Sequence, residues 1–280
     1  MNQNNQSFYV YKPKRFYVQV FIATWTFWLF AILFNEGLTC TIGMVLGVLC
    51  PASIAIITVF TSKSEALKKD FRRKIFNFWK LKPFYILGGY LIMAAIIFCS
   101  ILFSLLFGGE IKQFSFIEGF TFNGPGLCSA FLTITLASIL EEVGWRGYGE
   151  DSIAQYHSWF KESVIFGFVW AAWHIPLFWI PGTYQFEIRN MSYIYMFNFL
   201  ISVVPMGFIT TWVYVKNNRS MLASILFHLF VNFMQEKVAM TADTKCFETI
   251  FVTIAAAIIV LSNRDMFFEK RHIGNILESK

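Results

Sequence analysis

Residues 83–107 read PFYILGGYLIMAAIIFCSILFSLLF, a stretch of 25 residues without a charged side chain. A helix needs about 20 mostly apolar residues to cross the hydrocarbon core of a bilayer. This stretch meets that need, and the polar sequence GGEIKQ interrupts the apolar pattern directly after it. The sequence therefore predicts a membrane-spanning helix here.

Seven further apolar stretches predict the same structure, and they are separated by polar segments or by segments with glycine and proline. The eight predicted helices cover about Phe16–Asn35, Thr39–Thr61, Pro83–Phe107, Leu127–Val143, Ser163–Ile180, Tyr193–Val215, Met221–Met234 and Phe247–Leu261. No internal repeat and no long hydrophilic stretch is visible. We expect an all-α, polytopic membrane bundle of about eight transmembrane helices, forming a single integral-membrane domain over residues 1–280.

The composition supports a membrane protein and excludes several other classes. Of the 280 residues, 56% are hydrophobic and only 14% are charged, whereas soluble domains contain about 25% charged residues. This excludes a disordered chain, a nucleic-acid module and an ordinary cytosolic enzyme. The five cysteines are odd in number and none are closely paired, so we expect neither a disulfide framework nor a thiolate metal site.

The basic residues predict the orientation of the chain in the membrane. With eight spans, 19 of the 23 lysines and arginines fall on the side of both termini, which the positive-inside rule assigns to the cytoplasm. The opposite side receives only Lys112, Arg189, Lys237 and Lys245. The basic segment 61–83 is either a solvated loop or an amphipathic helix lying against anionic lipid. Short loops favour a prokaryotic plasma membrane as the location.

Charged side chains inside a span are costly, so they are functional candidates. The sequence LEEVGWR places Glu141 and Glu142 at the expected end of the fourth helix. Glu142 and Arg146 are four residues apart and can form an ion pair on one helix face. Glu141 points about 100° away and is left free for chemistry. The alternative is that both glutamates only mark the cytoplasmic end of the helix.

Two histidines lie in the apolar helices that follow. His174 comes four residues after Trp170 and shortly before Pro176, which should loosen the helix there. His228 and Asn232 are four apart and face the same way. These residues could also be a satisfied core histidine and a pair that holds helices together. However, the polar groups on all three helices fall in one shallow layer opening to the cytoplasm, which favours a common site.

The three motifs, in this order, resemble those of the CPBP family of intramembrane proteases, which includes the type II CAAX prenyl endopeptidases and the bacterial Abi proteins. The family pattern is E-E-x-x-x-R, then an aromatic residue four positions before a histidine, then H-x-x-x-N or H-x-x-x-B. The matching residues span a protease core of about 127–232, and they are Glu141, Glu142, Arg146, Trp170, His174, His228 and Asn232. In the family Phe is commoner than Trp at the position of Trp170, but either aromatic ring can line the site.

The resemblance implies glutamate-dependent hydrolysis of a peptide bond near the cytoplasmic side of the membrane. Glu141 and His174 would activate water, while His228 and Asn232 would form the oxyanion hole. Glu142, Arg146 and Trp170 would support the site. The expected partners are the lipid bilayer and a peptide or protein substrate, with a prenylated C-terminal tail as one candidate; no nucleic acid and no cofactor are expected.

Other interpretations remain open at this point. Two histidines and a glutamate could bind zinc, but the chain has no H-E-x-x-H and Asn232 is a poor zinc ligand. A non-catalytic protein on the same scaffold, with a role in bacteriocin immunity or in protein interaction, is the main alternative. A transporter with a Glu/His proton relay is a further one, although neither repeats nor paired broken helices are seen.

Overall fold

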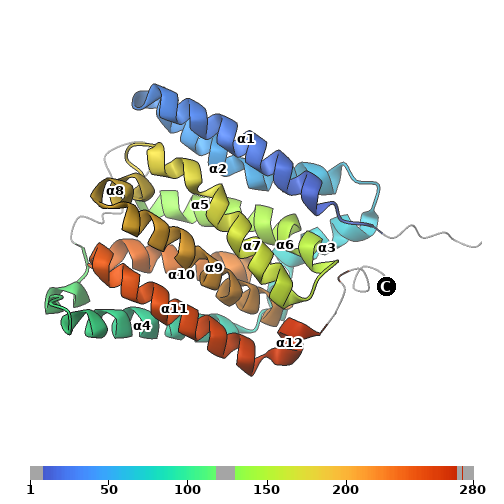
Figure 1. Cartoon of the computed structure of the whole chain (residues 1–280). Coiled ribbons are helices and arrows are strands. Elements are labelled where there is room, and N and C mark those ends of the chain that lie inside the picture. Colours follow the sequence, from blue (N-terminus) through green and yellow to red (C-terminus); the bar gives the residue numbers. More distant parts are fainter. Residues whose placement is uncertain (1–8, 118–129, 270–272, 274–280) are drawn as a thin grey trace, which may run out of the picture.

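The computed structural model describes residues 9–117, 130–269 and 273 and is a bundle of helices (Figure 1). Its α-helices are α1 (Pro13–Phe34), α2 (Gly37–Phe60), α3 (Glu65–Phe76), α4 (Pro83–Leu105), α5 (Ala130–Gly144), α6 (Glu150–Ala154), α7 (Trp159–Trp173), α8 (Tyr184–Met191), α9 (Tyr193–Lys216), α10 (Met221–Lys237), α11 (Ala242–Ser262) and α12 (Arg264–Phe268). Short 3₁₀ turns cover Phe78–Lys80, Ile111–Phe114 and Ile175–Trp179, and a π-helix covers Trp145–Gly149. The latter is called the π segment below.

The predicted all-α architecture is confirmed. The described residues contain no β-strand, only an isolated bridge between Phe116 and Val238. α1 and α2 lie along one side of the bundle and α4 and α11 along the other, with α5, α7, α9 and α10 between them (Figure 1). The helices that carry the three motifs are therefore the inner ones.

Each of the eight predicted apolar stretches coincides with a helix, but the count of eight spans is not confirmed. In the described part of the chain, α1, α2, α4, α9 and α11 are long and apolar enough to cross a membrane. A sixth candidate is the pair Trp159–Trp179 and Tyr184–Met191, which bends by 76°. α5 and α10 have only 15 and 17 residues. The first residues of the fourth predicted stretch, 127–129, and with them Cys128, lie outside the described residues.

The α1–α2 hairpin shows how the chain keeps its backbone satisfied in an apolar setting. Pro51 lies inside α2 and has no N–H, so the carbonyl of Gly47, one turn earlier, loses its helical donor. The Thr24 hydroxyl of α1 donates to that carbonyl at 3.2 Å. Such replacement matters because an unpaired backbone group is costly where water is excluded.

Contrary to the prediction, Glu141 and Glu142 do not close their helix. The backbone at Gly144 and at Glu150 is right-handed helical, so the chain continues from α5 through the π segment into α6. The sequence GWRGYGE resembles a helix end because it is polar and rich in glycine. Here its polar side chains are buried and find partners inside the protein, which allows the helix to go on.

The basic segment 61–83 contains a helix, α3, and this helix packs on the protein. Leu67 and Phe71 are buried, so one face of the helix meets the bundle. Lys74 is also buried, and its Nζ donates to the carbonyl oxygens of Arg146 and Gly147 at 2.9 and 2.6 Å. Lys74 thus adds a charged donor to two carbonyls of the π segment, and the Arg146 carbonyl also accepts from the Tyr214 hydroxyl at 3.1 Å.

A buried ion cluster fixes α3 to α6 and to the turn between α9 and α10. Lys74 contacts Asp151 at 2.7 Å, and Arg219 bonds both Asp151 and Asp70. The Tyr214 hydroxyl donates to Asp151 at 3.0 Å. Burial raises the pKa of Asp70, but the cations Arg219, Lys74 and Arg73 outweigh burial and hold that pKa below its usual range. The cluster ties the basic segment to the helical run that carries the glutamates.

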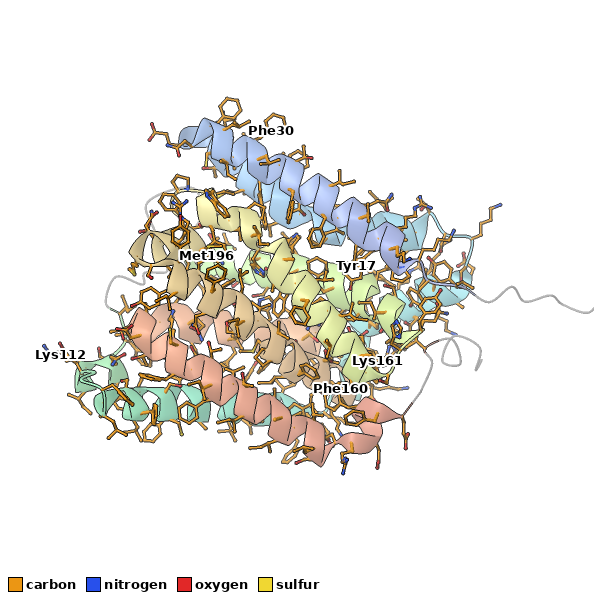
Figure 2. The ribbon with its side chains drawn as sticks, viewed as in Figure 1. Tyr17, Phe30, Lys112, Phe160, Lys161 and Met196 are labelled. Atoms are coloured by element: carbon orange, nitrogen blue, oxygen red, sulfur yellow. The ribbon has the colours of Figure 1, made fainter. Side chains whose placement is uncertain are left out.

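The positions of two lysines agree with the predicted distribution of charge between the two ends of the bundle. Lys161, predicted on the side of the termini, and Lys112, predicted on the opposite side, lie at opposite ends of the molecule (Figure 2). α3 and α12 lie at the same end as Lys161 (Figures 1 and 2). Which end faces the cytoplasm stays a prediction.

Candidate active site

One tryptophan orients both residues of the predicted water-activating pair. The indole N–H of Trp170 donates to Glu141 Oε2 at 2.9 Å, and the Trp170 carbonyl contacts His174 Nδ1 at 2.7 Å. Since a carbonyl oxygen can only accept, Nδ1 carries the proton, and Nε2 of the neutral ring keeps a lone pair. Among the described residues, neither Glu141 Oε1 nor His174 Nε2 has a hydrogen-bond partner.

The end of α7 places His174. The helix ends at Trp173, His174 is its C-cap, and the 3₁₀ turn Ile175–Trp179 follows. Pro176 explains the change, because it supplies no N–H for a further α-helical turn; this prediction is confirmed. The imidazole packs edge-on against Phe199 of α9, with ring centroids 5.4 Å apart.

Glu142 joins the first motif to the third. Its Oε1 accepts from Arg146 at 2.9 Å and from Nδ1 of His228 at 2.8 Å. The predicted ion pair between Glu142 and Arg146 is present and both side chains are fully buried. Nδ1 of His228 therefore carries a proton, and Nε2 has no partner among the described residues.

Arg146 has more partners than the sequence suggested. Its guanidinium also pairs with Glu150 at 3.0 Å, one turn further along, and bonds the hydroxyl of Thr210 on α9. It lies over the Phe166 ring, 4.8 Å from the centroid. A fully buried guanidinium needs such partners, because an uncompensated buried charge costs several kcal/mol; here both terminal nitrogens are bonded and Nε has no hydrogen-bond partner among the described residues.

Asn232 and His228 bond to different residues of α5. The Asn232 amide donates to the Ser138 hydroxyl at 3.3 Å, whereas His228 bonds Glu142. Ser138 and Glu142 are four residues apart, as are His228 and Asn232, so the two helices pair in register along one face. One N–H of the Asn232 amide stays free of these bonds, because the amide nitrogen carries two protons.

The structure brings all seven motif residues together. Two branches, His174–Trp170–Glu141 and Arg146–Glu142–His228, meet where the Trp170 ring lies edge-on to His228 with centroids 5.5 Å apart. Six of the seven residues are buried and Asn232 is partly buried. In residues 9–117, 130–269 and 273, no three His, Cys, Asp or Glu side chains gather closely enough to hold a metal ion.

Sequence reasoning missed three residues that support this arrangement: Ser138, Glu150 and Thr210. The first two could have been found, because Ser138 precedes Glu142 by one turn and Glu150 follows Arg146 by one turn. For Glu150 this needed the assumption that the helix continues past Val143. Thr210 carries no such signal, since only the packing of α9 brings it to Arg146.

Comparison with known proteins agrees with these motifs. Residues 123–234 match the family described as Type II CAAX prenyl endopeptidase Rce1-like. The chain is also 40% identical over 268 residues to CAAX prenyl protease 2 of Methanococcus maripaludis, which covers 94% of this chain and 98% of that relative. The chain belongs to the CAAX prenyl protease family. Both matches name CAAX prenyl proteases and neither names the Abi branch of the resemblance.

Membership of the CAAX prenyl protease family confirms the resemblance drawn from the three motifs, which all lie within residues 123–234. The match to the relative extends over most of the chain, so it includes the helices outside this core. Together with the long apolar helices, it makes this chain an integral, multi-pass membrane protein.

The two glutamates should differ in what their loss does to stability. Glu142→Gln removes a charge that two buried partners share, and breaking a buried ion pair costs about 3–5 kcal/mol. Glu141→Gln should have little effect, since an amide oxygen can still accept from Trp170. Thermal unfolding of both variants in the same detergent should give a clearly lower Tm for Glu142→Gln only. Equal values of Tm would contradict the supporting role of Glu142.

Proposed function

We propose that this chain is an intramembrane, glutamate-dependent endopeptidase acting on C-terminal tails of the CAAX type. The observation that carries the proposal is the double role of Trp170. It holds one oxygen of Glu141 and one nitrogen of His174, so that Glu141 Oε1 and His174 Nε2 are left as two acceptors. Two acceptors fixed in this way are what a general base needs to bind and deprotonate a water molecule.

In this mechanism the water oxygen attacks the carbonyl carbon of the scissile peptide, and Glu141 takes the proton. The Trp170 indole stabilises the charged carboxylate before the step and His174 shares the hydrogen bonding to the water. Glu141 then returns the proton to the leaving amine, which breaks the C–N bond and restores the carboxylate. No serine or cysteine nucleophile is needed.

The oxyanion of the tetrahedral intermediate would be held by α10. Asn232 offers its second amide N–H, and His228 faces the site through Nε2 because Nδ1 is bonded to Glu142. Glu142 provides the counter-charge that a doubly protonated His228 needs in order to donate through Nε2. Arg146 and Glu150 keep Glu142 in place.

We infer that the site lies near the cytoplasmic side, with both termini in the cytoplasm of a prokaryotic cell. This is supported by the distribution of lysines and arginines, of which 19 of 23 fall on the predicted inner side. The separation of Lys161 from Lys112 agrees with that distribution (Figure 2). A substrate tail anchored in the inner leaflet by a prenyl group would then reach the site.

The experiment that tests the proposal is cleavage of matched C-terminal peptides, with and without a prenylated cysteine, by the purified protein. We expect cleavage of the prenylated tail and its loss in Glu141→Gln, because the base is gone while the fold is kept. Glu236→Gln changes an exposed glutamate on α10 and should keep full turnover. If no tail is cleaved, a non-catalytic role on this scaffold would be the better interpretation.

Activity should not depend on a metal ion. Asn232 is a poor metal ligand, and Nδ1 of His228 is already bonded to Glu142. Turnover measured before and after exhaustive chelation should be equal, and elemental analysis of the active protein should find no stoichiometric zinc. Activity that disappears on chelation and returns only with added zinc would overturn the metal-free mechanism.

Loss of the Asn232 amide should act on the transition state. Asn232→Ala should lower kcat by about 10²–10³ and leave KM nearly unchanged. Ser138→Ala removes the hydroxyl that positions the amide and should lower kcat by a smaller factor. Asn190→Ala, at an exposed asparagine on α8, is the control. A lowered Tm with unchanged kcat for Asn232→Ala would instead identify a residue that only holds α5 and α10 together.

A further inference from the structure

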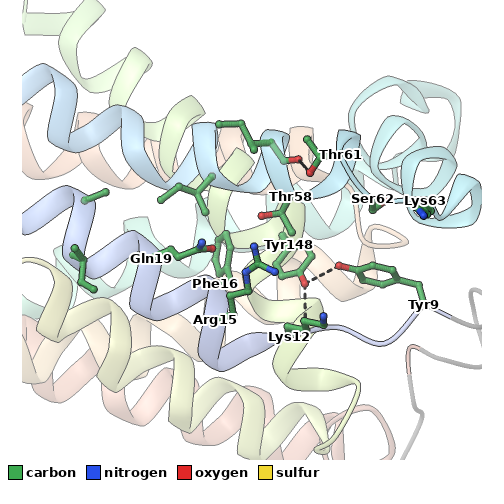
Figure 3. Close-up of a pocket in the computed structure, with 14 residues that line it drawn as sticks. Tyr9, Lys12, Arg15, Phe16, Gln19, Thr58, Thr61, Ser62, Lys63 and Tyr148 are labelled. Atoms are coloured by element: carbon green, nitrogen blue, oxygen red, sulfur yellow. Dashed lines mark hydrogen bonds between the residues drawn. The ribbon is translucent and has the colours of Figure 1, made fainter.

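A groove of about 590 Å³ lies between α1 and α2, at the end of the hairpin away from its turn (Figure 3). It is lined by the first three turns of α1 and the last two of α2, by residues just before α1 and just after α2, and by Tyr148 of the π segment. None of the seven motif residues lines it. The groove is thus separate from the candidate active site. The two are connected only because Tyr148 lies on the same continuous helix, α5 and the π segment, as Glu141, Glu142 and Arg146.

One part of the groove is strongly basic. Lys12, Arg15 and Lys63 line it, and no acidic side chain does. None of these three cations forms an ion pair with another described residue. Figure 3 labels all three cations among the residues that line the groove. Three cations without counter-ions around one cavity favour an anionic ligand.

The other part of the groove is apolar and faces outward. Ile22 of α1 and Ile57 of α2 line it, and they are 65% and 60% exposed. Both belong to helices that are long and apolar enough to cross a membrane. An apolar surface on such helices faces hydrocarbon chains. A ligand that fills the whole groove must therefore carry an anionic group at one end and an alkyl chain at the other.

We propose that this groove is a binding site for a membrane lipid with an anionic phosphate headgroup. The phosphate lies among Lys12, Arg15 and Lys63, and an acyl or alkyl chain runs between Ile22 and Ile57. Arginine and lysine both bind phosphate oxygens through charge-assisted hydrogen bonds. Free phosphate satisfies the basic part alone, and a neutral lipid satisfies the apolar part alone.

The site would also connect the lipid to the helix that carries the glutamates. The Tyr148 hydroxyl accepts from the backbone N–H of Lys12 at 3.1 Å and bonds the Tyr9 hydroxyl at 2.9 Å. Tyr148 lies two residues after Arg146, within the π segment. A lipid bound to Lys12 and Arg15 therefore holds α1 against the segment on which Arg146 is placed.

The test measures binding of phosphatidylglycerol, phosphatidylcholine and inorganic phosphate to the full-length protein in a neutral detergent. Native mass spectrometry counts retained lipid, and thermal unfolding reports stabilisation. We expect phosphatidylglycerol to bind and to raise Tm. Phosphatidylcholine and inorganic phosphate should bind much more weakly and raise Tm much less. The triple variant Lys12→Gln, Arg15→Gln, Lys63→Gln should raise the Kd for phosphatidylglycerol at least tenfold.

A matched variant separates this site from general attraction to negative charge. Lys14, Lys69 and Lys80 are exposed and do not line the groove, so replacing all three by Gln removes the same charge. This control should keep wild-type affinity. Any of three results would overturn the proposal. Both triple variants could lose the same affinity for phosphatidylglycerol, phosphatidylcholine could bind as tightly as phosphatidylglycerol, or inorganic phosphate could raise Tm by the same amount.

One further result would assign the groove to the substrate. If the groove variant raised KM for the tail peptide in lipid-free detergent while phosphatidylglycerol binding stayed intact, the groove would be a substrate site and the lipid proposal would be wrong. Because binding and Tm are measured without substrate, the lipid site can stand or fall independently of the proposed peptidase activity.

Discussion

The fully buried guanidinium of Arg146 is the constraint on which the centre of this protein depends. A cation without water must be surrounded by compensating groups, and Arg146 has a carboxylate one turn before it, another one turn after it, and the Thr210 hydroxyl across on α9. Because Glu142 also accepts from His228, the same charge that stabilises Arg146 sets the orientation of α10. The first and third motifs thus form one connected network, and the bond from Trp170 to Glu141 joins the second motif to it.

At the end of the bundle where α3 lies, residues outside the active site hold the helical run from α5 to α6 in place. Lys74 donates to the carbonyls of Arg146 and Gly147, which fixes α3 to the π segment. Tyr148, directly after, contacts α1 and lines the basic groove (Figure 3). The segment is therefore held between an ion cluster on one side and the proposed lipid site on the other, and both would limit how Arg146 moves.

Much of the fold could be predicted because membrane helices are a local property of sequence. An apolar stretch must form a helix to satisfy its own backbone where water is absent, so all eight predicted stretches coincide with helices in the structure. The ion pair of Glu142 with Arg146 was predictable for the same reason, since i and i+4 are neighbours on any helix. The order of the three motifs was enough to indicate the family.

The sequence by itself determined where the helices lie and which polar residues belong together. Only the tertiary structure decided that the helix continues past Val143, that Trp170 orients both Glu141 and His174, and that Asn232 pairs with Ser138. It also decided that α3 packs on the protein through Lys74. The reason is physical: whether a polar side chain ends a helix or stays buried within it depends on partners that are distant in sequence, and packing alone brings those partners into hydrogen-bonding distance.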